Sequence, residues 1–390
     1  MDLCIKDHSG AHDQEGIRQP REPSGYRCAN RMYFPHPWLN AAYHLPAVRH
    51  GWVFVDFFFV LSGFVISYNY ADVIRGRTTA WVFLIRRFFR LYPLHIAALA
   101  ACLTLDLVRN LLLPRLTSIQ VRTPIDVGYW VDVGYSALLL SGVGVTSNPG
   151  PNSPSWSIST ELFAYLAFCG VALVVGRARR MLAFMILAVV AFVGLQVLQG
   201  WSGINGPLEF RLLRCLYAFS LGVLVHELHL RQGSPSDSAG KSLILQLVAW
   251  ACIGLLLARM ESVDPLSSLL PPLFAVVVLA AVRDSGSVML RLLGIRACRR
   301  LGDWSYSIYM VHAFVVSIIG FVVNRFSTGM GEIDGISRAL LPTGYGELLV
   351  LVYVALVLWV SSMTYRWIEC PWRERGAQLA RRVAKPLKSP

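Results

Sequence analysis

Long apolar runs recur along almost the whole chain and predict membrane-spanning helices. The hydrocarbon core of a bilayer is about 30 Å thick, so a helix needs about 20 apolar residues to cross it. Nine runs approach this length, at residues 52–70, 91–110, 157–176, 181–199, 211–228, 242–260, 266–282, 305–324 and 346–364. The pattern predicts an all-α fold, a polytopic transmembrane helical bundle of about nine or ten spans.

A tenth run, residues 128–145, is interrupted by four glycines and by Asp132. Glycine is unfavourable inside a helix. If this run does not cross the membrane, the arginine-rich connections all fall on one side, which the Lys/Arg bias marks as cytoplasmic. We therefore predict that residues 128–145 are re-entrant or interfacial and that the C-terminus is cytoplasmic.

Polarity divides the chain into three parts. Residues 1–50 are polar and hold no apolar stretch of the kind that a signal peptide requires. Residues 51–364 hold the spans of a transmembrane domain, and residues 365–390 form a basic, cytoplasmic tail. The charge bias places residue 51 outside, so residues 1–50 lie there without a preceding span. We expect either a short translocated tail or the loss of a first span that relatives have.

Composition agrees with an integral membrane protein and limits the classes of function. Of the 390 residues, 55% are hydrophobic and 15% are charged, whereas soluble domains carry roughly 25% charged residues. The net charge of +13 gathers on one membrane face, so we expect no nucleic-acid partner. The eight cysteines are scattered without C-x-x-C or zinc-type spacing, and we predict no disulfide scaffold and no metal site.

Asp56 lies within an apolar run, V-D-F-F-F-V-L-S-G-F at residues 55–64. A carboxylate inside a membrane span is costly and by default marks a functional site. Gly63, on the same helix face, permits close contact between helices. The alternative for Asp56 is a structural hydrogen bond to a neighbouring helix. For Ser62 and Gly63 we predict a packing role.

Glu161 ends the segment P-S-W-S-I-S-T-E, residues 154–161, which opens a predicted span from the outside. Ser157 or Ser159 can cap this helix, and Glu161 can close a capping box or favour the positive end of the helix dipole. Glu161 also stands where the apolar run begins, at the same predicted membrane level as Asp56. We predict that Glu161 is a site carboxylate, with capping as the alternative.

Arg87 and Arg90 stand in F-L-I-R-R-F-F-R-L-Y-P-L-H, at the predicted cytoplasmic end of the second span. Positions i and i+3 share one helix face, where two like charges repel, so the arrangement favours an anion between them. Guanidinium pairs suit phosphate. The alternative is a membrane anchor whose side chains snorkel to lipid headgroups.

Two further titratable groups have structural interpretations. His312 lies mid-span among tyrosine and serine residues that can satisfy its hydrogen bonds. Glu369 follows the last span and is predicted to pair with Arg366 or Arg373. The chain contains no G-x-S-x-G, P-loop or G-x-G-x-x-G motif.

Taken in order, five motifs across residues 51–372 resemble the acyltransferase-3 family of integral membrane O-acyltransferases. They are D-F-F-F-V-L-S-G-F, the R-x-x-R before L-Y-P, W-S-I-S-T-E, Y-S-I-Y-M-V-H and the closing I-E-x-P. The resemblance implies transfer of an acetyl group from acetyl-CoA to a hydroxyl of a cell-surface or secreted carbohydrate, or of a lipid-linked glycan, in the bacterial inner membrane.

The resemblance also assigns roles to single residues. Arg87 and Arg90 correspond to the arginine pair associated with the acyl-CoA donor. Asp56 falls in the second-span motif, and Glu161 matches the acid of W-S-x-x-x-E. The family's first span carries an arginine, which has no counterpart here, and a histidine, which His44 in A-A-Y-H-L matches.

The catalytic residues expected on this basis are therefore His44, Asp56 and Glu161. His36 is a poorer match than His44 to the family histidine. Our hypothesis is that residues 1–50 are an altered or mis-started version of the N-terminus of a functional relative.

Acyl transfer to a hydroxyl needs a base for the proton and a donor for the developing oxyanion. A histidine oriented by a carboxylate is a usual solution. The predicted topology separates Arg87 and Arg90 from the carboxylates by most of the membrane. We expect either that the pantetheine arm threads inward between helices or that an acyl-carrying intermediate crosses.

Two other functions fit the same residues. In a transporter or flippase of a lipid-linked sugar, Asp56 and Glu161 would relay protons or bind substrate. The sequence shows no inverted repeat of the kind that transporters often have. In a catalytically inactive relative, the absent first span would leave only a binding or regulatory role.

Overall fold

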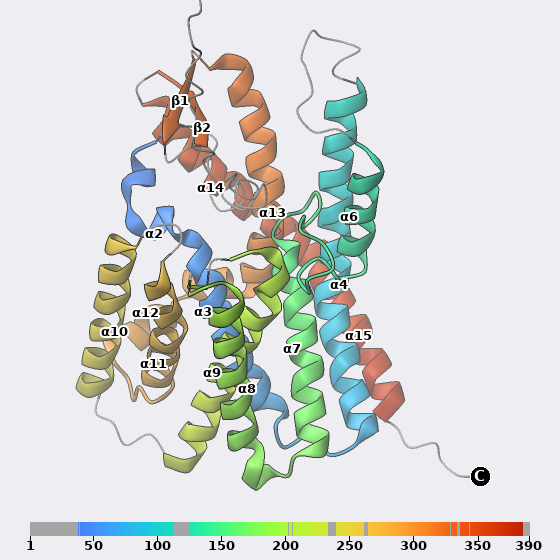
Figure 1. Ribbon diagram of the computed structural model, residues 1–390, viewed down its shortest axis with the longest axis vertical. Coiled ribbons are helices and arrows are strands. Elements are labelled where there is room, and N and C mark those ends of the chain that lie inside the picture. The colour runs from blue at the N-terminus through green and yellow to red at the C-terminus, as the bar shows by residue number, and fades with distance from the viewer. Residues whose placement is uncertain are drawn as a thin grey trace, which may run out of the picture.

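The structure is a computed structural model, and helices make up most of it (Figure 1). It describes residues 38, 40–112, 125–201, 203–204, 206–232, 239–260, 264–327, 329–333, 336–342 and 344–384. The all-α class predicted from the apolar runs is confirmed. The α-helices are α2 (Pro46–Arg49), α3 (Phe54–Tyr70), α4 (Arg77–Leu107), α6 (Val127–Ala137), α7 (Ser155–Val174), α8 (Arg177–Leu198), α9 (Arg211–Gln232), α10 (Ala239–Arg259), α11 (Leu270–Val282), α12 (Val288–Leu293), α13 (Arg296–Phe326), α14 (Tyr345–Thr364) and α15 (Cys370–Ala384).

Short helical turns connect or extend several of these helices. The 3-10 turns are η1 (Ala41–His44), η2 (Gly51–Val53), η4 (Leu208–Phe210) and η5 (Pro265–Leu269). Two further turns have π geometry, η3 (Val108–Leu112) and η6 (Tyr365–Glu369). π turns often occur at functional sites, and Tyr365 of η6 lines a cavity.

Eight of the described helices are long and apolar enough to cross a membrane: α3, α4, α7, α8, α10, α11, α13 and α14 with its continuation into α15. Many apolar side chains on α8, α10 and α14 are exposed, as expected where a helix faces lipid. Eight helices of this length and composition are typical of a multi-pass membrane protein.

The ninth predicted span, residues 211–228, forms a helix that differs from the other eight. α9 is 22 residues long, but it is not among the helices that are apolar enough to cross. Its polar side chains Arg211, Arg214, His226 and Glu227 are buried, and the helix packs against α3 and α8. Burial against protein lets α9 carry groups that lipid would not accept.

α3 and α9 approach each other through two glycines. A Cβ atom on Gly63 would lie 2.0 Å from the carbonyl oxygen of Phe219, and one on Gly222 would lie 1.9 Å from that of Val60. Any larger residue would push the helices apart, so the packing role predicted for Gly63 is confirmed. This contact lies in the main apolar core, which includes Phe219 and Val60.

Two boundaries bear on the sequence predictions. α6 has only 11 residues and would span roughly 16 Å, so the run at 128–145 does not form a full span. The helix that holds the second predicted span, residues 91–110, begins well before it, because α4 starts at Arg77. Aromatic and aliphatic residues before Arg90 continue the apolar pattern of the helix. Arg77, Arg86 and Arg87 interrupt this pattern, so the sequence did not show that the helix begins so early.

A second, smaller core lies at the end of the molecule where β1 and β2 are found (Figure 1). β1 (Gly329–Ile333) and β2 (Ile336–Leu340) form an antiparallel pair in which Gly329 is opposite Leu340. Trp38 bridges to Ala339 in β2, and its indole Nε1 donates to the carbonyl of Gly346, at 3.0 Å. The described end of the polar N-terminal segment is thus packed between β2 and α14.

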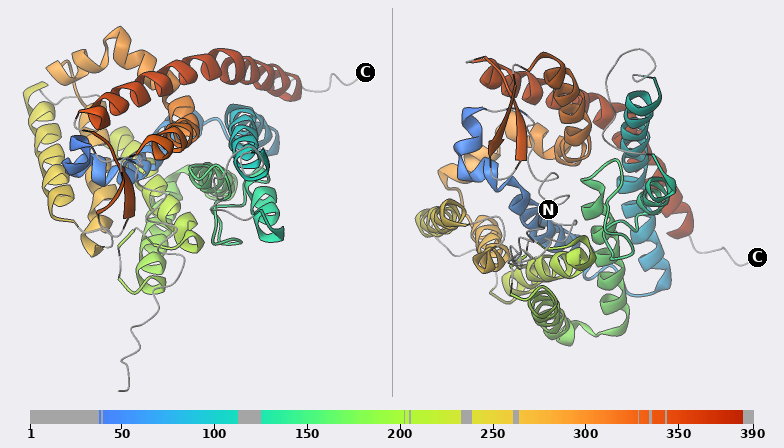
Figure 2. Two further views of the ribbon diagram at one scale, coloured as in Figure 1. Left: turned by 90° about the horizontal axis from the view of Figure 1, so that it is seen from above. Right: turned by 45° about the horizontal axis from the view of Figure 1, so that its top comes forward.

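α14, η6 and α15 form one long, continuous helical rod at the edge of the molecule (Figure 2). Pro371, in the first turn of α15, has no N–H to give to the carbonyl four residues earlier. The wider π turn η6 lies at this point, as expected where a helical hydrogen bond is lost. The last part of the rod, α15, packs along α4.

Candidate active site

A cavity of about 390 Å³ lies among α3, α4, α7 and α13. Much of its wall is apolar, as is usual for small-molecule sites, and a few polar groups converge on it. These polar groups are Ser62, Arg87, Arg90, Ser157, Glu161, Tyr165, Ser305, Tyr306 and Tyr309. We call this space the central cavity.

Glu161 is the carboxylate of the central cavity. Its Oε1 accepts hydrogen bonds from the hydroxyls of Ser62, at 2.6 Å, and Tyr165, at 2.5 Å. The two hydroxyl oxygens lie 3.2 Å apart. Among the described residues, Oε2 has no hydrogen-bond or ion-pair partner. One carboxylate oxygen is therefore held in place while the other remains available in the cavity.

The capping alternative for Glu161 is wrong, because α7 starts earlier than that alternative required. The helix begins at Ser155, which puts Glu161 in its second turn. Ser159, predicted as a possible cap, instead donates to the carbonyl of Leu139 at 2.5 Å and accepts from the backbone N–H of Gly142 at 3.1 Å. These bonds fix α7 to the irregular segment after α6 and so set the position of Glu161.

Arg87 is held by aromatic rings and not by an acid. Its guanidinium carbon lies 5.0 Å from the ring centre of Tyr70, 5.7 Å from that of Phe83 and 5.9 Å from that of Tyr165. Cation–π contacts of this kind orient an arginine without neutralising its charge. The buried Nε atom has no hydrogen-bond partner within the described part of the chain. The positive charge of Arg87 is thus available to an anion.

The structure brings Arg87, Arg90 and Glu161 to one cavity, so the predicted separation by most of the membrane is wrong. α4 starts at Arg77, which places both arginines roughly 15–20 Å along its axis. α7 runs the opposite way and ends at Val174, so Glu161 lies roughly 20 Å from that end. Figure 1 shows these ends of α4 and α7 on the same side of the molecule.

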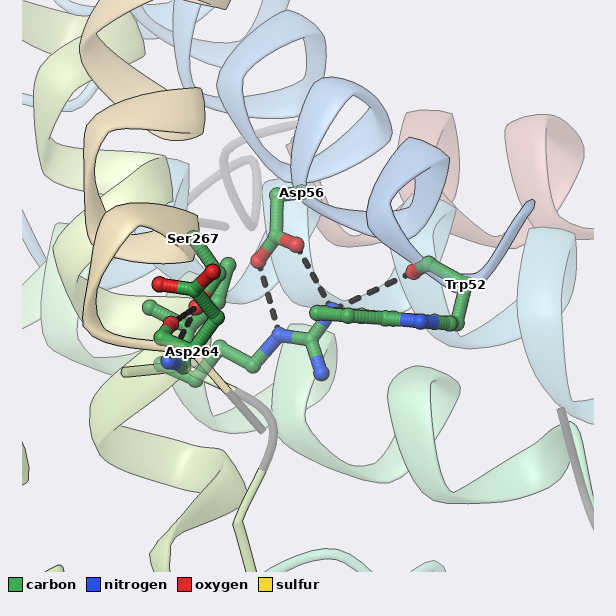
Figure 3. A network of polar contacts seen from close by, with 6 residues as sticks. Trp52, Asp56, Asp264 and Ser267 are labelled. Atoms are coloured by element: carbon green, nitrogen blue, oxygen red, sulfur yellow. Dashed lines mark hydrogen bonds and ion pairs between the residues drawn. The ribbon is translucent and has the colours of Figure 1, made fainter. Parts of the chain in front are cut away.

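Asp56 lies outside the central cavity in a closed ion pair. Arg214 Nε donates to Oδ1 at 2.8 Å and Nη2 donates to Oδ2 at 2.6 Å, and the two side chains are 0% and 1% exposed. Nη2 also donates to the carbonyl of Trp52 at 3.2 Å. Figure 3 shows Asp56 and the Trp52 carbonyl converging on this guanidinium group. The structural alternative given for Asp56, a bond to a neighbouring helix, is what the structure contains.

His44 is not brought to either carboxylate. It is the exposed last residue of η1, with its ring 6.2 Å from that of Tyr43, and it does not line the central cavity. Of the five predicted site residues, the structure therefore joins Arg87, Arg90 and Glu161. The catalytic role of His44 stays a prediction.

Sequence reasoning missed Arg214 and the hydroxyl groups around Glu161. Arg214 is an arginine inside a predicted span, a signal that should have directed attention to a partner for Asp56. Ser62 was given a packing role, yet it donates to Glu161. Tyr165 is one helical turn after Glu161, so their spacing alone predicted a contact.

The structural roles given to His312 and Glu369 agree with the structure. Nδ1 of His312 lies 2.6 Å from the carbonyl oxygen of Tyr309 in its own helix. Glu369 pairs with Arg373 at 3.7 Å and accepts from the hydroxyl of Ser307 at 3.1 Å. Within the described ranges, no three His, Cys, Asp or Glu side chains are grouped so that they could hold a metal ion.

A largely apolar cavity with a few converging polar groups, placed among membrane-length helices, is typical of an integral membrane protein with a reaction or binding site between its helices. The acyltransferase domain of the acyltransferase-3 family matches residues 30–366. The chain belongs to this family.

The chain is similar to a curated protein over part of its length. The relative, "Protein 2 in picA locus" of Rhizobium radiobacter, is 35% identical over 121 residues, which are 28% of this chain. The chain spans 59% of the length of that relative. No solved structure matches.

Proposed function

We propose that this membrane acyltransferase moves an acetyl group from acetyl-CoA to a hydroxyl of a cell-surface or secreted carbohydrate. The observation that carries this proposal is the arrangement in the central cavity, where a carboxylate with one available oxygen shares the cavity wall with two arginines. The family supports acyl transfer. The carboxylate supplies a base, and the arginines supply affinity for a phosphorylated donor.

The acceptor hydroxyl would lose its proton to Oε2 of Glu161 as its oxygen attacks the thioester carbonyl. A C–O bond forms, the C–S bond breaks, and the proton on Glu161 passes to the departing CoA thiolate. Atoms and charges balance without another reagent. Ser62 and Tyr165 hold Oε1, so the base keeps its orientation through the cycle.

The charge that develops on the carbonyl oxygen needs donors that are already in place. The cavity offers hydroxyls from α7 and α13. Ser157 donates to Tyr309 at 2.8 Å, and Tyr309 donates to the carbonyl of Pro154 at 3.1 Å. Because each of these hydroxyls already donates its proton within the cavity wall, they join α7 to α13, and we assign the oxyanion to the guanidinium groups of Arg87 and Arg90, which line the same cavity. In this proposal the enzyme acts in a bacterial inner membrane, with α15 on the cytoplasmic side from which acetyl-CoA comes.

The proposal is tested by mass analysis of surface glycans from cells with and without the gene. We expect acetyl increments, released by mild alkali as esters, that disappear in the deletion strain and return with the wild-type gene. A gene carrying Arg87→Ala and Arg90→Ala should restore less than about 1% of the ester, as expected when donor contacts made by charged groups are lost.

The matched control is Arg179→Ala, which removes an exposed arginine far from the cavity residues in the chain. It should restore full acetylation at equal protein level in the membrane. Glycans that keep their acetyl groups in the deletion strain, or a double arginine variant that restores them fully, would refute the proposal.

A further inference from the structure

A second cavity, of about 530 Å³, lies beyond Arg87 and Arg90 and is lined by η6 and α15 as well as α4. Its charged lining consists of Arg86, Arg87, Arg90, Arg373, Arg381 and Glu374. Five positive side chains and one negative one share this space, which we call the arginine cavity. Arg87 and Arg90 belong to the walls of both cavities, so the two spaces adjoin at this pair.

α15 is fixed against α4 by a close contact between their apolar faces. A Cβ atom on Gly376 would lie 2.4 Å from Cβ of Phe89, and the rings of Phe89 and Trp372 are 6.0 Å apart. Ala380, one turn after Gly376, is fully buried. Only small residues at these positions allow α15 to lie so close to α4, and this sets the width of the arginine cavity.

The same packing aims a stripe of α15 into the cavity. Arg373, Ala377 and Arg381 all line it, and their spacing of four residues puts them on one helix face. The two arginines are separated by roughly 12 Å along the helix axis. Glu369, at the end of η6, pairs with Arg373 at 3.7 Å and fixes its direction. Arg381 has no hydrogen-bond or ion-pair partner in the described part of the chain.

Such a set of arginines is suited to phosphate. Each guanidinium presents a planar fork of donors that can bind phosphate oxygens in pairs. Without an anion, like charges at i, i+3 and i, i+4 repel each other. A ligand that fills both cavities must have a polyanionic part that extends from α15 to Arg87 and Arg90 and a neutral, narrow part beyond them. A nucleotide joined to a thioester by a long neutral arm has this form.

We propose that α15 completes the donor site: Arg373 and Arg381, with Arg86 of α4, bind the nucleotide phosphates of acyl-CoA in the arginine cavity. Arg87 and Arg90, where the two cavities adjoin, contact the phosphate from which the pantetheine arm begins, and the arm presents the thioester to Glu161. This inference rests on the proposed function for the identity of the donor. α15 begins at Cys370, beyond the residues that match the family, so nothing in the family match assigns it a role.

The test compares two donors in full-length protein reconstituted in phosphatidylcholine nanodiscs. Acetyl-CoA carries the nucleotide, and S-acetylpantetheine keeps the arm and the thioester without it. Arg373→Ala with Arg381→Ala should raise KM for acetyl-CoA about 10- to 100-fold and leave KM for S-acetylpantetheine unchanged. The matched control, Arg382→Ala, removes an exposed arginine of the same helix that does not line the cavity, and KM should not change.

Arg373→Ala also removes the ion pair with Glu369, so a second variant is needed that keeps this pair. Ala377→Glu keeps both arginines and adds a carboxylate between them, so it should weaken CoA binding without affecting S-acetylpantetheine. High salt should raise KM for acetyl-CoA alone, because the contacts are ionic. Equal effects on both donors, or no effect on either, would overturn the proposal.

Direct binding of unacylated CoA separates this inference from the proposed function. In one outcome the wild type binds CoA, the arginine variants bind it with an affinity at least about 10-fold lower, and no acceptor is acetylated. This outcome supports the CoA site and contradicts the proposed function. If the variants still acetylate the acceptor and bind CoA with wild-type affinity, the proposed function is supported and the proposed CoA site is contradicted. Phosphatidylglycerol is the second probe in this binding assay. If the arginine variants retain less phosphatidylglycerol than the wild type but bind CoA with unchanged affinity, the arginine cavity is a lipid headgroup site and the inference is overturned.

Discussion

Two intramembrane carboxylates of this protein have opposite surroundings. Both oxygens of Asp56 are bound by Arg214 in a pocket closed to solvent. Glu161 has one oxygen held by two hydroxyls, and its other oxygen belongs to a cavity that it shares with two arginines. The difference is that Asp56 has both oxygens bound by an arginine, whereas Glu161 keeps one oxygen beside free space. Of the two, the acid with an available oxygen next to free space is the stronger candidate for chemistry.

The largest effect is expected from Glu161→Gln. The amide keeps the size of the side chain but cannot take a proton, so turnover of acetyl-CoA should fall about 10²- to 10⁴-fold. The unfolding midpoint should change little, because Ser62 and Tyr165 can still donate to the amide oxygen. Retention of more than a tenth of the wild-type turnover would remove Glu161 from the role of base.

The next largest effect is expected on the free energy of unfolding when Asp56 is replaced. Asp56→Asn leaves the buried charge of Arg214 uncompensated and should cost about 3–5 kcal/mol. Adding Arg214→Met should recover most of that loss, because no buried charge then remains. Stability would be measured by denaturant titration of the protein in detergent.

The same two variants also test whether Asp56 is a structural or a catalytic residue. If Asp56→Asn left stability unchanged and abolished turnover in the folded protein, Asp56 would have the catalytic role predicted from the sequence. A folded double variant that retains turnover would instead establish Asp56 as a structural residue.

The smallest effect is expected from Ser62→Ala. It removes one of the two hydrogen bonds to Oε1 of Glu161, a loss of about 1 kcal/mol. Tyr165 still holds the carboxylate, so turnover should fall only several-fold at unchanged KM for acetyl-CoA. Unaltered turnover together with a large loss of stability would show that Ser62 acts in packing, as its sequence context first indicated.

The spans were predictable because apolar length is a local property of the sequence. The start of α4 was not, because its first turns contain Arg77, Arg86 and Arg87. In a hydropathy pattern these charges look like a loop. In the fold they face the two cavities or the outside of the bundle, so the helix continues through them.

The candidate site was predictable only in part, for a related reason. Glu161, Arg87 and Arg90 could be selected as polar residues with specific spacing in apolar segments. Whether an acid is paired depends on contacts between distant segments, such as that of Asp56 with Arg214, and a single sequence does not contain that information. The contact of α15 with α4 was hidden for the same reason, since its basic composition suggested only a tail.

The Asp56–Arg214 pair also has a consequence for biosynthesis. The two residues are 158 positions apart, and ribosomes add roughly 5–20 residues per second, so Asp56 is added to the chain roughly 8–30 s before Arg214. During that interval the first described span contains an acid without its partner. An unpaired carboxylate in a span costs a few kcal/mol, so we expect α3 to gain stability in the membrane when α9 brings Arg214 to Asp56.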